Sequence, residues 1–144
     1  MGGAKASASH FGKPVLSTLS VISVIDDDAS VRAATSNLLG SHGYQVYTFA
    51  SAEEFLQSVR LSETSCVIAD VQMSAMSGLD LLTHMRAEGF GVPFIFITAF
   101  HEESVRARAL KAGAICFLAK PFAGPTLINC LEVALNQHRG GTSQ

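Results

Sequence analysis

Short runs of β-branched and other apolar residues alternate along the chain with segments whose apolar positions recur at helical spacing. The runs predict strands at residues 21–25, 44–48, 66–69, 94–98 and 115–119. The intervening and final segments predict helices at residues 29–41, 52–60, 78–87, 102–112 and 124–138. The chain therefore repeats a strand followed by a helix five times.

Local signals agree with this periodicity. Gly43 and Gly113 fall just after the first and fourth predicted helices, where a left-handed C-terminal cap favours glycine. Ser51 precedes the second predicted helix and Glu54 follows three residues later, which is the pattern of a capping box. These residues support the helix boundaries.

Strands that alternate with helices predict an α/β fold, with parallel strands joined by right-handed crossovers and helices on both faces. The strands "SVISVI" and "VPFIFIT" carry apolar residues on both of their faces, as expected for strands buried on both sides. Five such units suit an open, doubly wound, five-stranded parallel sheet. The flavodoxin-like order 2-1-3-4-5 is common at this size, although periodicity does not choose an order.

Composition sets the number of domains. A chain of 144 residues with 48% hydrophobic residues suits one compact domain. We expect a flexible N-terminal extension at 1–19, rich in Gly, Ala and Ser, a folded domain at 20–138, and a flexible C-terminal tail at 139–144.

Charge and hydropathy limit the kinds of partner that the chain is expected to bind. The longest apolar run, 92–100, falls short of the roughly 18 residues that a membrane helix needs, so we expect no membrane association. The formal net charge is -2, and there is no block of lysines and arginines, which argues against direct nucleic-acid contact by this chain.

Three cysteines are present, at positions 66, 116 and 130. They are odd in number, have apolar neighbours and match no metal-ligand spacing. We therefore expect Cys66, Cys116 and Cys130 to be buried free thiols in a reducing compartment, which favours the cytoplasm.

Polar residues end most of the predicted strands. In an open parallel sheet, ligands bind outside the carboxyl ends of the strands, where the winding direction reverses. The polar residues at these ends are Asp26, Asp27 and Asp28 after the first strand, Asp70 after the third, Thr98 at the end of the fourth and Lys120 after the fifth. In the order 2-1-3-4-5, these side chains would meet at one edge of the sheet.

This set of side chains suits phosphoryl chemistry. Several carboxylates in one pocket favour a cation, and oxygen ligands of this kind suit Mg²⁺. An ionised Asp70 would be a nucleophile able to form an aspartyl phosphate. Mg²⁺ and Lys120 would neutralise the phosphoryl oxygens, and the Thr98 hydroxyl would bind one of them.

Four motifs, "VISVIDDDASVR", "VIADVQMSAMSG", "FIFITAF" and "FLAKPF", together resemble the receiver domain of two-component response regulators. The resemblance covers about residues 20 to 138. It is closest to the receivers that precede helix-turn-helix output domains in transcriptional regulators. Each motif alone is weak, and the four in this order form a strong signal.

The resemblance implies roles for the residues at the acidic sites. Asp26 and Asp27 match the acidic pair, with Asp27 the more direct Mg²⁺ ligand, and Asp70 matches the phosphoacceptor. Gln72 would offer its backbone carbonyl to the metal.

The remaining motif residues match the response of the family to phosphorylation. Thr98 matches the switch hydroxyl, Phe117 the aromatic switch residue whose rotamer follows it, and Lys120 the phosphate-pairing lysine before a cis Pro121. The face made by segments 102–112, 115–119 and 124–138 would then change on phosphorylation and mediate homodimer or output-domain contacts.

The resemblance also implies a function. The chain would accept a phosphoryl group from a phosphohistidine of a sensor histidine kinase and would hydrolyse its own aspartyl phosphate, without being a conventional enzyme. A C-terminal DNA-binding output domain could follow it. Ser74 departs from the usual Pro in the loop after Asp70, and Phe100 predicts slow hydrolysis by shielding the phosphate.

Two other functions remain open on the sequence. The segment Asp26-Asp27-Asp28-Ala29-Ser30 fits the nucleophile motif of haloacid-dehalogenase-like phosphatases if Ser is allowed, although that family needs a later acidic motif that this chain lacks. A receiver fold could also bind partners without phosphorylation. For Asp28, which precedes a predicted helix, capping is the favoured interpretation.

Overall fold

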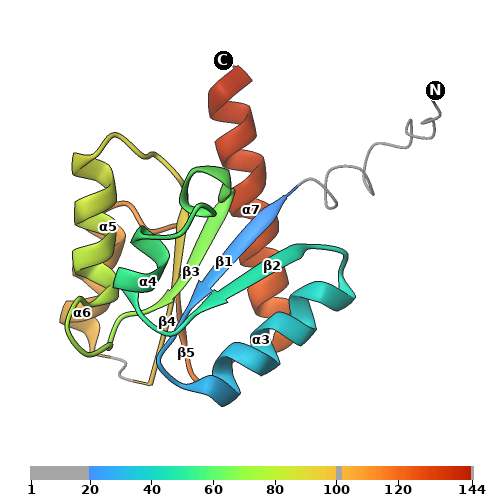
Figure 1. Ribbon diagram of the computed structural model, residues 1–144, viewed down its shortest axis with the longest axis horizontal. Helices are drawn as coiled ribbons and strands as arrows, with labels where there is room; N and C mark the ends of the chain where they lie inside the picture. The colour runs from blue at the N-terminus through green and yellow to red at the C-terminus, as the bar shows by residue number, and fades with distance from the viewer. Residues whose placement is uncertain (1–19, 100–101, 144) are drawn as a thin grey trace.

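The computed structural model describes residues 20–99 and 102–143. Its strands are β1 (Val21–Ile25), β2 (Gln45–Phe49), β3 (Cys66–Asp70), β4 (Phe94–Thr98) and β5 (Cys116–Ala119). Its α-helices are α3 (Ala29–Ser41), α4 (Ala52–Leu56), α5 (Gly78–Ala87), α6 (Glu103–Lys111) and α7 (Gly124–Ser143), and a 3-10 helix, η2, covers Leu61–Glu63. Figure 1 uses the same labels.

All of these strands are parallel, and they form one sheet in the order β2-β1-β3-β4-β5. The register pairs Ile25 with Ala69, and Asp70 with Ile97, so the carboxyl ends of the inner strands lie side by side. The prediction of a doubly wound, flavodoxin-like α/β fold with five strands is confirmed.

Helices cover both faces of the sheet (Figure 1). Phe94 and Phe96 of β4 pack into a cluster with apolar residues of α4, α5 and α6. Ile95 and Ile97 of the same strand pack into a second cluster with residues of α3 and α7. Alternate side chains of a strand point to opposite faces, which explains why β4 is apolar from Phe94 to Ile97, before it ends in Thr98.

The observed boundaries differ from the predicted ones in six elements. β3 ends one residue later than predicted, at Asp70, β5 starts one residue later, at Cys116, and α6 is one residue shorter at each end, at Glu103–Lys111. β2 lies one residue later than predicted, at Gln45–Phe49. α4 ends at Leu56 rather than at residue 60. In the turn that follows, the Ser58 hydroxyl accepts a hydrogen bond from the Arg60 amide. α7 continues to Ser143, past the predicted end at residue 138, because the apolar pattern that guided the prediction stops before the helix does.

Capping residues fix the helix starts. The Asp28 carboxylate caps α3, as predicted, by accepting hydrogen bonds from the amides of Ser30 and Val31. The Ser51 hydroxyl caps α4 by accepting a hydrogen bond from the Glu54 amide, but the Glu54 carboxylate accepts one from the Ala50 amide rather than from the Ser51 amide. Ser77 and Asp80 form the complete capping box, at the start of α5.

The cysteine prediction needs a correction. Cys116 of β5 and Cys130 of α7 form a disulfide, with a Cα–Cα distance of 6.2 Å. Only Cys66 is a free, fully buried thiol among the described residues. The prediction failed because the packing of α7 on the sheet brings together two residues that are 14 positions apart, which residue spacing alone cannot show.

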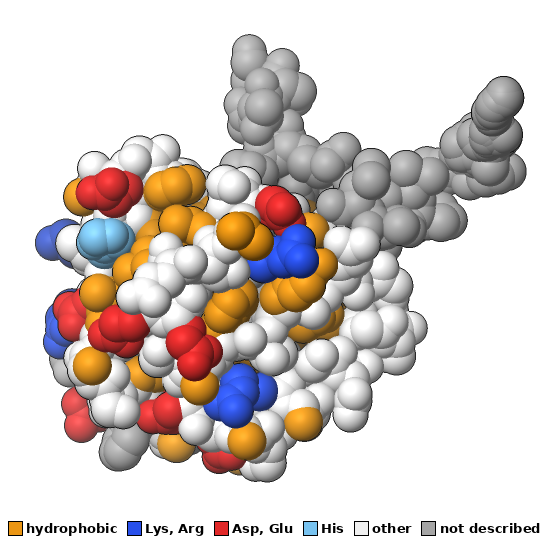
Figure 2. All heavy atoms as spheres, in the orientation of Figure 1, with side chains coloured by type: hydrophobic (Ala, Val, Ile, Leu, Met, Phe, Trp, Pro, Cys, Tyr) orange, Lys and Arg blue, Asp and Glu red, His pale blue; other side chains and the backbone are white. Residues whose placement is uncertain are grey.

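The surface in the orientation of Figure 1 carries both signs of charge. Acidic and basic side chains lie interspersed among hydrophobic ones across this face (Figure 2). Within the described residues, we find no helix with the length and apolar character needed to cross a bilayer.

Candidate functional site

The predicted site residues meet at the carboxyl edge of the sheet. Asp26 directly follows β1, Asp70 ends β3, Thr98 ends β4 and Lys120 directly follows β5. The sheet order makes β1 and β3 neighbours, with β4 and β5 next to them. The structure therefore brings together residues that lie up to 94 positions apart in the sequence.

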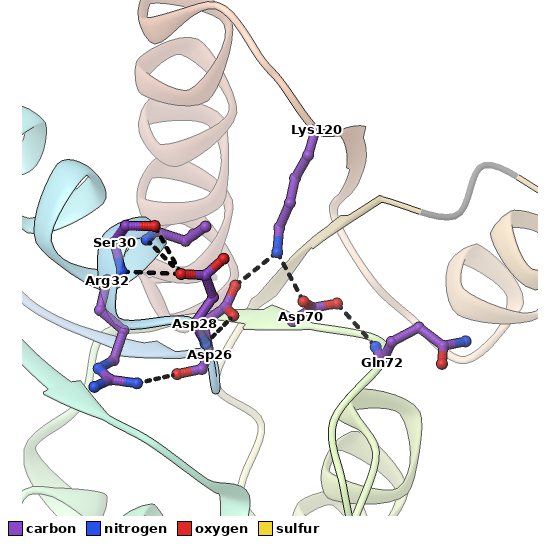
Figure 3. A network of polar contacts seen from close by, with 8 residues as sticks. Asp26, Asp28, Ser30, Arg32, Asp70, Gln72 and Lys120 are labelled. Atoms are coloured by element: carbon purple, nitrogen blue, oxygen red, sulfur yellow. Dashed lines mark hydrogen bonds and ion pairs between the residues drawn. The ribbon is translucent and has the colours of Figure 1, made fainter.

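Lys120 joins the two buried carboxylates. Its Nζ atom donates to Oδ2 of Asp70 at 2.8 Å and to Oδ2 of Asp26 at 3.0 Å (Figure 3). Hydrogen bonds to Asp70 and Asp26 raise the pKa of Lys120, although burial by itself would lower it. The ammonium group therefore stays charged between the two acids.

Asp26 is fully buried and has several partners. Its Oδ1 atom accepts a hydrogen bond from the Asp28 amide at 2.9 Å, and its backbone carbonyl accepts one from Nη1 of Arg32 at 2.6 Å. Burial raises the pKa of Asp26 above its ordinary value, and the bonds from Asp28 and Lys120 oppose that effect only in part. Ionised Asp26 is thus held in place at a cost in stability.

Asp28 has a different environment. Its carboxylate accepts hydrogen bonds from the Ser30 hydroxyl at 2.7 Å and from the Ser30 amide at 2.9 Å. These bonds hold the pKa of Asp28 below its ordinary value. Its carboxylate caps α3, as predicted.

Three carboxylates could hold a metal. Asp26, Asp27 and Asp70 each offer an oxygen, and these atoms lie within 4.8 Å of one another. Asp27 is exposed, while Asp70 is 5% exposed. A set of oxygen-only ligands suits a hard cation such as Mg²⁺, which keeps several of its own waters.

The loop after Asp70 is held close to this cluster. The Gln72 amide donates to Oδ1 of Asp70 at 2.8 Å, so both oxygens of the Asp70 carboxylate have partners. Met76 donates its amide to Oε2 of Glu53 in α4 at 3.2 Å. Gln72, predicted as a metal ligand through its carbonyl, is therefore next to the cluster, and that role stays a prediction.

The predicted switch residues lie on neighbouring strands. Thr98 is fully buried, pairs with Ala119 in the register and accepts a hydrogen bond from the Lys120 amide on its backbone carbonyl, at 2.8 Å. Phe117 pairs with Phe96 and is half-buried. The Lys120-Pro121 peptide bond is cis, as expected. Phe100, predicted to shield the phosphate, lies outside the described residues.

Three residues at the site carry roles that the sequence did not suggest. Arg32 binds the Asp26 carbonyl, and Glu53 binds the loop after Asp70. Gly78, at the start of α5, lies so close to the Asp70 backbone that a Cβ atom there would collide with the Asp70 carbonyl oxygen and come within 2.9 Å of Phe96. The only sequence signal for it was a glycine at a helix start.

Comparison with known proteins gives a consistent result. The family model described as "Response regulator receiver domain" matches residues 22–132. The response regulator protein TodT of Pseudomonas putida is 40% identical over 116 residues, which cover 81% of this chain and 51% of TodT. The transcriptional regulatory protein TdiR of Thauera aromatica is 38% identical over 120 residues, covering 83% of this chain and 53% of TdiR.

A solved structure also matches. The response regulator StyR superposes with a TM-score of 0.77 and 39% identity, over 85% of this chain and 64% of that one. The chain spans about half the length of TodT and TdiR.

Proposed function

Because the chain belongs to the receiver-domain family of response regulators, we propose that it accepts a phosphoryl group on Asp70 from a phosphohistidine of a sensor kinase. The observation that carries the proposal is the position of Lys120, whose ammonium binds both Asp26 and Asp70 beside the three-carboxylate cluster. A cation beside a strand-end carboxylate is what an incoming phosphoryl group requires.

The side chains have distinct parts in the transfer. An oxygen of Asp70 attacks the phosphorus, the new P–O bond forms and the P–N bond to the kinase histidine breaks, with the imidazole leaving as the neutral base after protonation. Lys120 already donates to Asp70 and balances the charge of the phosphoryl oxygens. The hydroxyl of Thr98 binds one of these oxygens after transfer.

Asp26, Asp27 and Asp70, with the Gln72 carbonyl, would hold the metal. Bound Mg²⁺ would supply charge neutralisation for the transferred group. Asp26 is buried, which raises the pKa of its carboxyl group, and a bound cation would favour its ionised form. The Arg32 side chain donates a hydrogen bond to the backbone carbonyl of Asp26 and so holds the Asp26 backbone in place.

Phosphorylation would then shift an equilibrium between two conformations that already exists in the free protein. Thr98 moves toward the phosphate, and Phe117 follows into the space beside it. The face built from α6, β5 and α7 changes in consequence, and it mediates homodimer or output-domain contacts.

The rest of the proposal concerns the longer protein and its setting. Since TdiR is a transcriptional regulatory protein about twice as long as the matched region, we place a DNA-binding output domain after residue 144 and assign the chain to transcription regulation in the cytoplasm. Residues 20–138 would form the receiver, and α7 extends past its predicted end. Hydrolysis of the aspartyl phosphate is slow if Phe100 shields it.

Intact-mass spectrometry after incubation with a small phosphodonor such as acetyl phosphate tests the proposal. Wild-type protein should gain one phosphoryl group in Mg²⁺ and much less in a chelator, and Asp70→Asn should gain none. Asp28→Asn is the matched control, because asparagine also caps helices and Asp28 lies outside the cluster. It should gain the group normally.

The two alternative functions predict different results in the same labelling experiment. No gain by folded wild-type protein would favour an interaction module that works without phosphorylation. A gain that survives in Asp70→Asn and disappears in Asp26→Asn would favour a phosphatase of the haloacid-dehalogenase type.

A further inference from the structure

We propose that Cys116 and Cys130 form a reversible redox pair that exchanges with small thiols such as glutathione, and that it locks and releases the connection between β5 and α7. The starting observation is the disulfide between them, which was not expected from the sequence, since all three cysteines were predicted to be free thiols. Neither the family nor the phosphoryl chemistry described above requires it.

The three cysteines differ in access. Cys116 and Cys130 are half-buried and pack against the apolar cluster between the sheet and α7. Cys66 is fully buried, and burial raises the pKa of its thiol far above the ordinary value. Because the thiolate is the reacting form, Cys66 is inert and the pair is the reactive unit.

The disulfide holds an element that has few other constraints. β5 is an edge strand, paired with β4 on one side only. Cys116 lies at its start, opposite Ile95, and the crosslink fixes this end of β5 to the helix that packs across β3 and β4. Cutting the crosslink leaves β5 with its β4 ladder and its apolar contacts.

The loop that the disulfide closes includes one residue of the site, Lys120, and the predicted switch residue Phe117. Lys120 and Pro121 lie between the two cysteines, and Phe117 directly follows Cys116. The crosslink therefore restrains the residues that carry the ammonium bound to Asp26 and Asp70. A disulfide in a cytoplasmic protein is usually transient and redox-sensing, which fits a restraint that is applied and removed.

Glutathione reduces the disulfide by two successive thiol–disulfide exchange steps. A glutathione thiolate attacks one sulfur of the pair, and the other cysteine leaves as a thiolate. A second glutathione thiolate then attacks the mixed disulfide at the glutathione sulfur and releases the remaining cysteine thiolate. Two glutathione molecules become glutathione disulfide, their two protons end on Cys116 and Cys130, and two electrons pass to the protein. Oxidation is the reverse.

The consequence for signalling rests on the proposed function. If Phe117 and the Lys120 segment must move when Asp70 is phosphorylated, the oxidised form resists that movement and the reduced form permits it. The redox state of the cell would then set how strongly a given level of phosphorylation acts on the face made by α6, β5 and α7.

Two measurements test the pair without any phosphorylation. The purified protein is equilibrated in buffers with varied ratios of glutathione to glutathione disulfide and then quenched. It is denatured and alkylated, and its intact mass is measured by mass spectrometry. We expect one thiol to be alkylated at the oxidising end and three at the reducing end, with a reversible transition between them. Cys66→Ala should keep the transition, and Cys130→Ser should abolish it.

Hydrogen exchange followed by mass spectrometry then compares peptides covering 117–129 in the two forms. A crosslink that closes a loop of about 15 residues typically changes an opening equilibrium by roughly 100-fold. We expect exchange in this segment to be markedly slower in the oxidised form, while peptides of α3 exchange alike. Cys130→Ser should match reduced wild-type protein in either buffer.

Three results would overturn the proposal. The first is three alkylated thiols in every buffer, the second is a disulfide that glutathione cannot reduce in the native protein, and the third is equal exchange of 117–129 in both forms. None of these outcomes depends on whether Asp70 accepts phosphate, so the pair and the receiver function can fail separately.

Discussion

Gly78 lies against the backbone carbonyl of Asp70, and only a residue without a side chain fits there. A Cβ atom at this position would collide with the Asp70 carbonyl oxygen and lie 2.9 Å from Cε1 of Phe96. The Gly78 amide donates to the Val71 carbonyl at 3.1 Å, which anchors the start of α5 to the end of β3. The packing of this helix therefore sets the backbone position of the proposed phosphoacceptor.

Gly78→Ala should consequently destabilise the protein. Overpacking of a well-packed site typically costs about 1–3 kcal/mol, and we expect a loss in that range by urea denaturation, with slower phosphoryl uptake. Gly40→Ala in α3 is the control, because a Cβ there meets nothing within 4 Å. It should be neutral or stabilising by up to about 1 kcal/mol. Equal effects of the two changes would refute the close-approach argument.

Asp26→Asn should stabilise the protein at neutral pH in the absence of metal. Burial raises the pKa of Asp26 in the folded state, so its ionisation lowers the free energy of unfolding as the pH rises through the raised value. Below the ordinary pKa of an aspartate this cost is absent.

Thermal unfolding of both proteins across pH measures this effect. The advantage of Asp26→Asn should be largest at neutral pH and should shrink toward zero in acid, while Asp27→Asn, at an exposed position, should show a smaller effect. A variant less stable than wild type at neutral pH would show that the bond to Lys120 outweighs the burial of the charge.

Added Mg²⁺ should raise the melting temperature of the wild-type protein. A ligand that binds only the folded state stabilises it by about 2.7 kcal/mol at 100 times its dissociation constant. Asp27→Asn should lose most of this shift, because it removes one of the three clustered carboxylates. Glu88→Gln, an exposed change outside the cluster, should retain it. A full shift in Asp27→Asn would place the metal elsewhere.

Ser77→Ala should weaken the start of α5. The Ser77 hydroxyl accepts a hydrogen bond from the Asp80 amide at 3.1 Å, and the Asp80 carboxylate accepts one from the Ser77 amide at 3.3 Å. Loss of such a cap costs about 1 kcal/mol, measurable by urea denaturation. Ser104→Ala on the exposed side of α6 is the matched control, with little expected change. The capping account fails if both variants unfold at the same urea concentration.

The sequence predicted the fold well because its signals are local and repeated. Four helix starts and two complete strands, Val21–Ile25 and Phe94–Thr98, match the predicted bounds. Asp28 was expected to cap α3 and does so. The end of α4 was missed because the turn after Leu56 depends on hydrogen bonds of Ser58 that a periodic pattern does not contain.

The site was predictable in composition and less so in its supporting contacts. Strand-end positions and the family resemblance predicted that Asp26, Asp70 and Lys120 would meet, and their hydrogen bonds show that they do. The contacts of Arg32 and Glu53 depend on how helices lie against loops, which one sequence does not reveal. The pairing of two cysteines was hidden for the same reason.

The position of the transferred group tests the central claim most directly. Wild-type protein labelled in Mg²⁺ is reduced with borohydride, which converts an aspartyl phosphate to homoserine, and is then digested for peptide sequencing by mass spectrometry. We predict homoserine at position 70 and unmodified aspartate at positions 26, 27 and 28. Homoserine at position 26 with Asp70 intact, or no homoserine in folded labelled protein, would contradict the account.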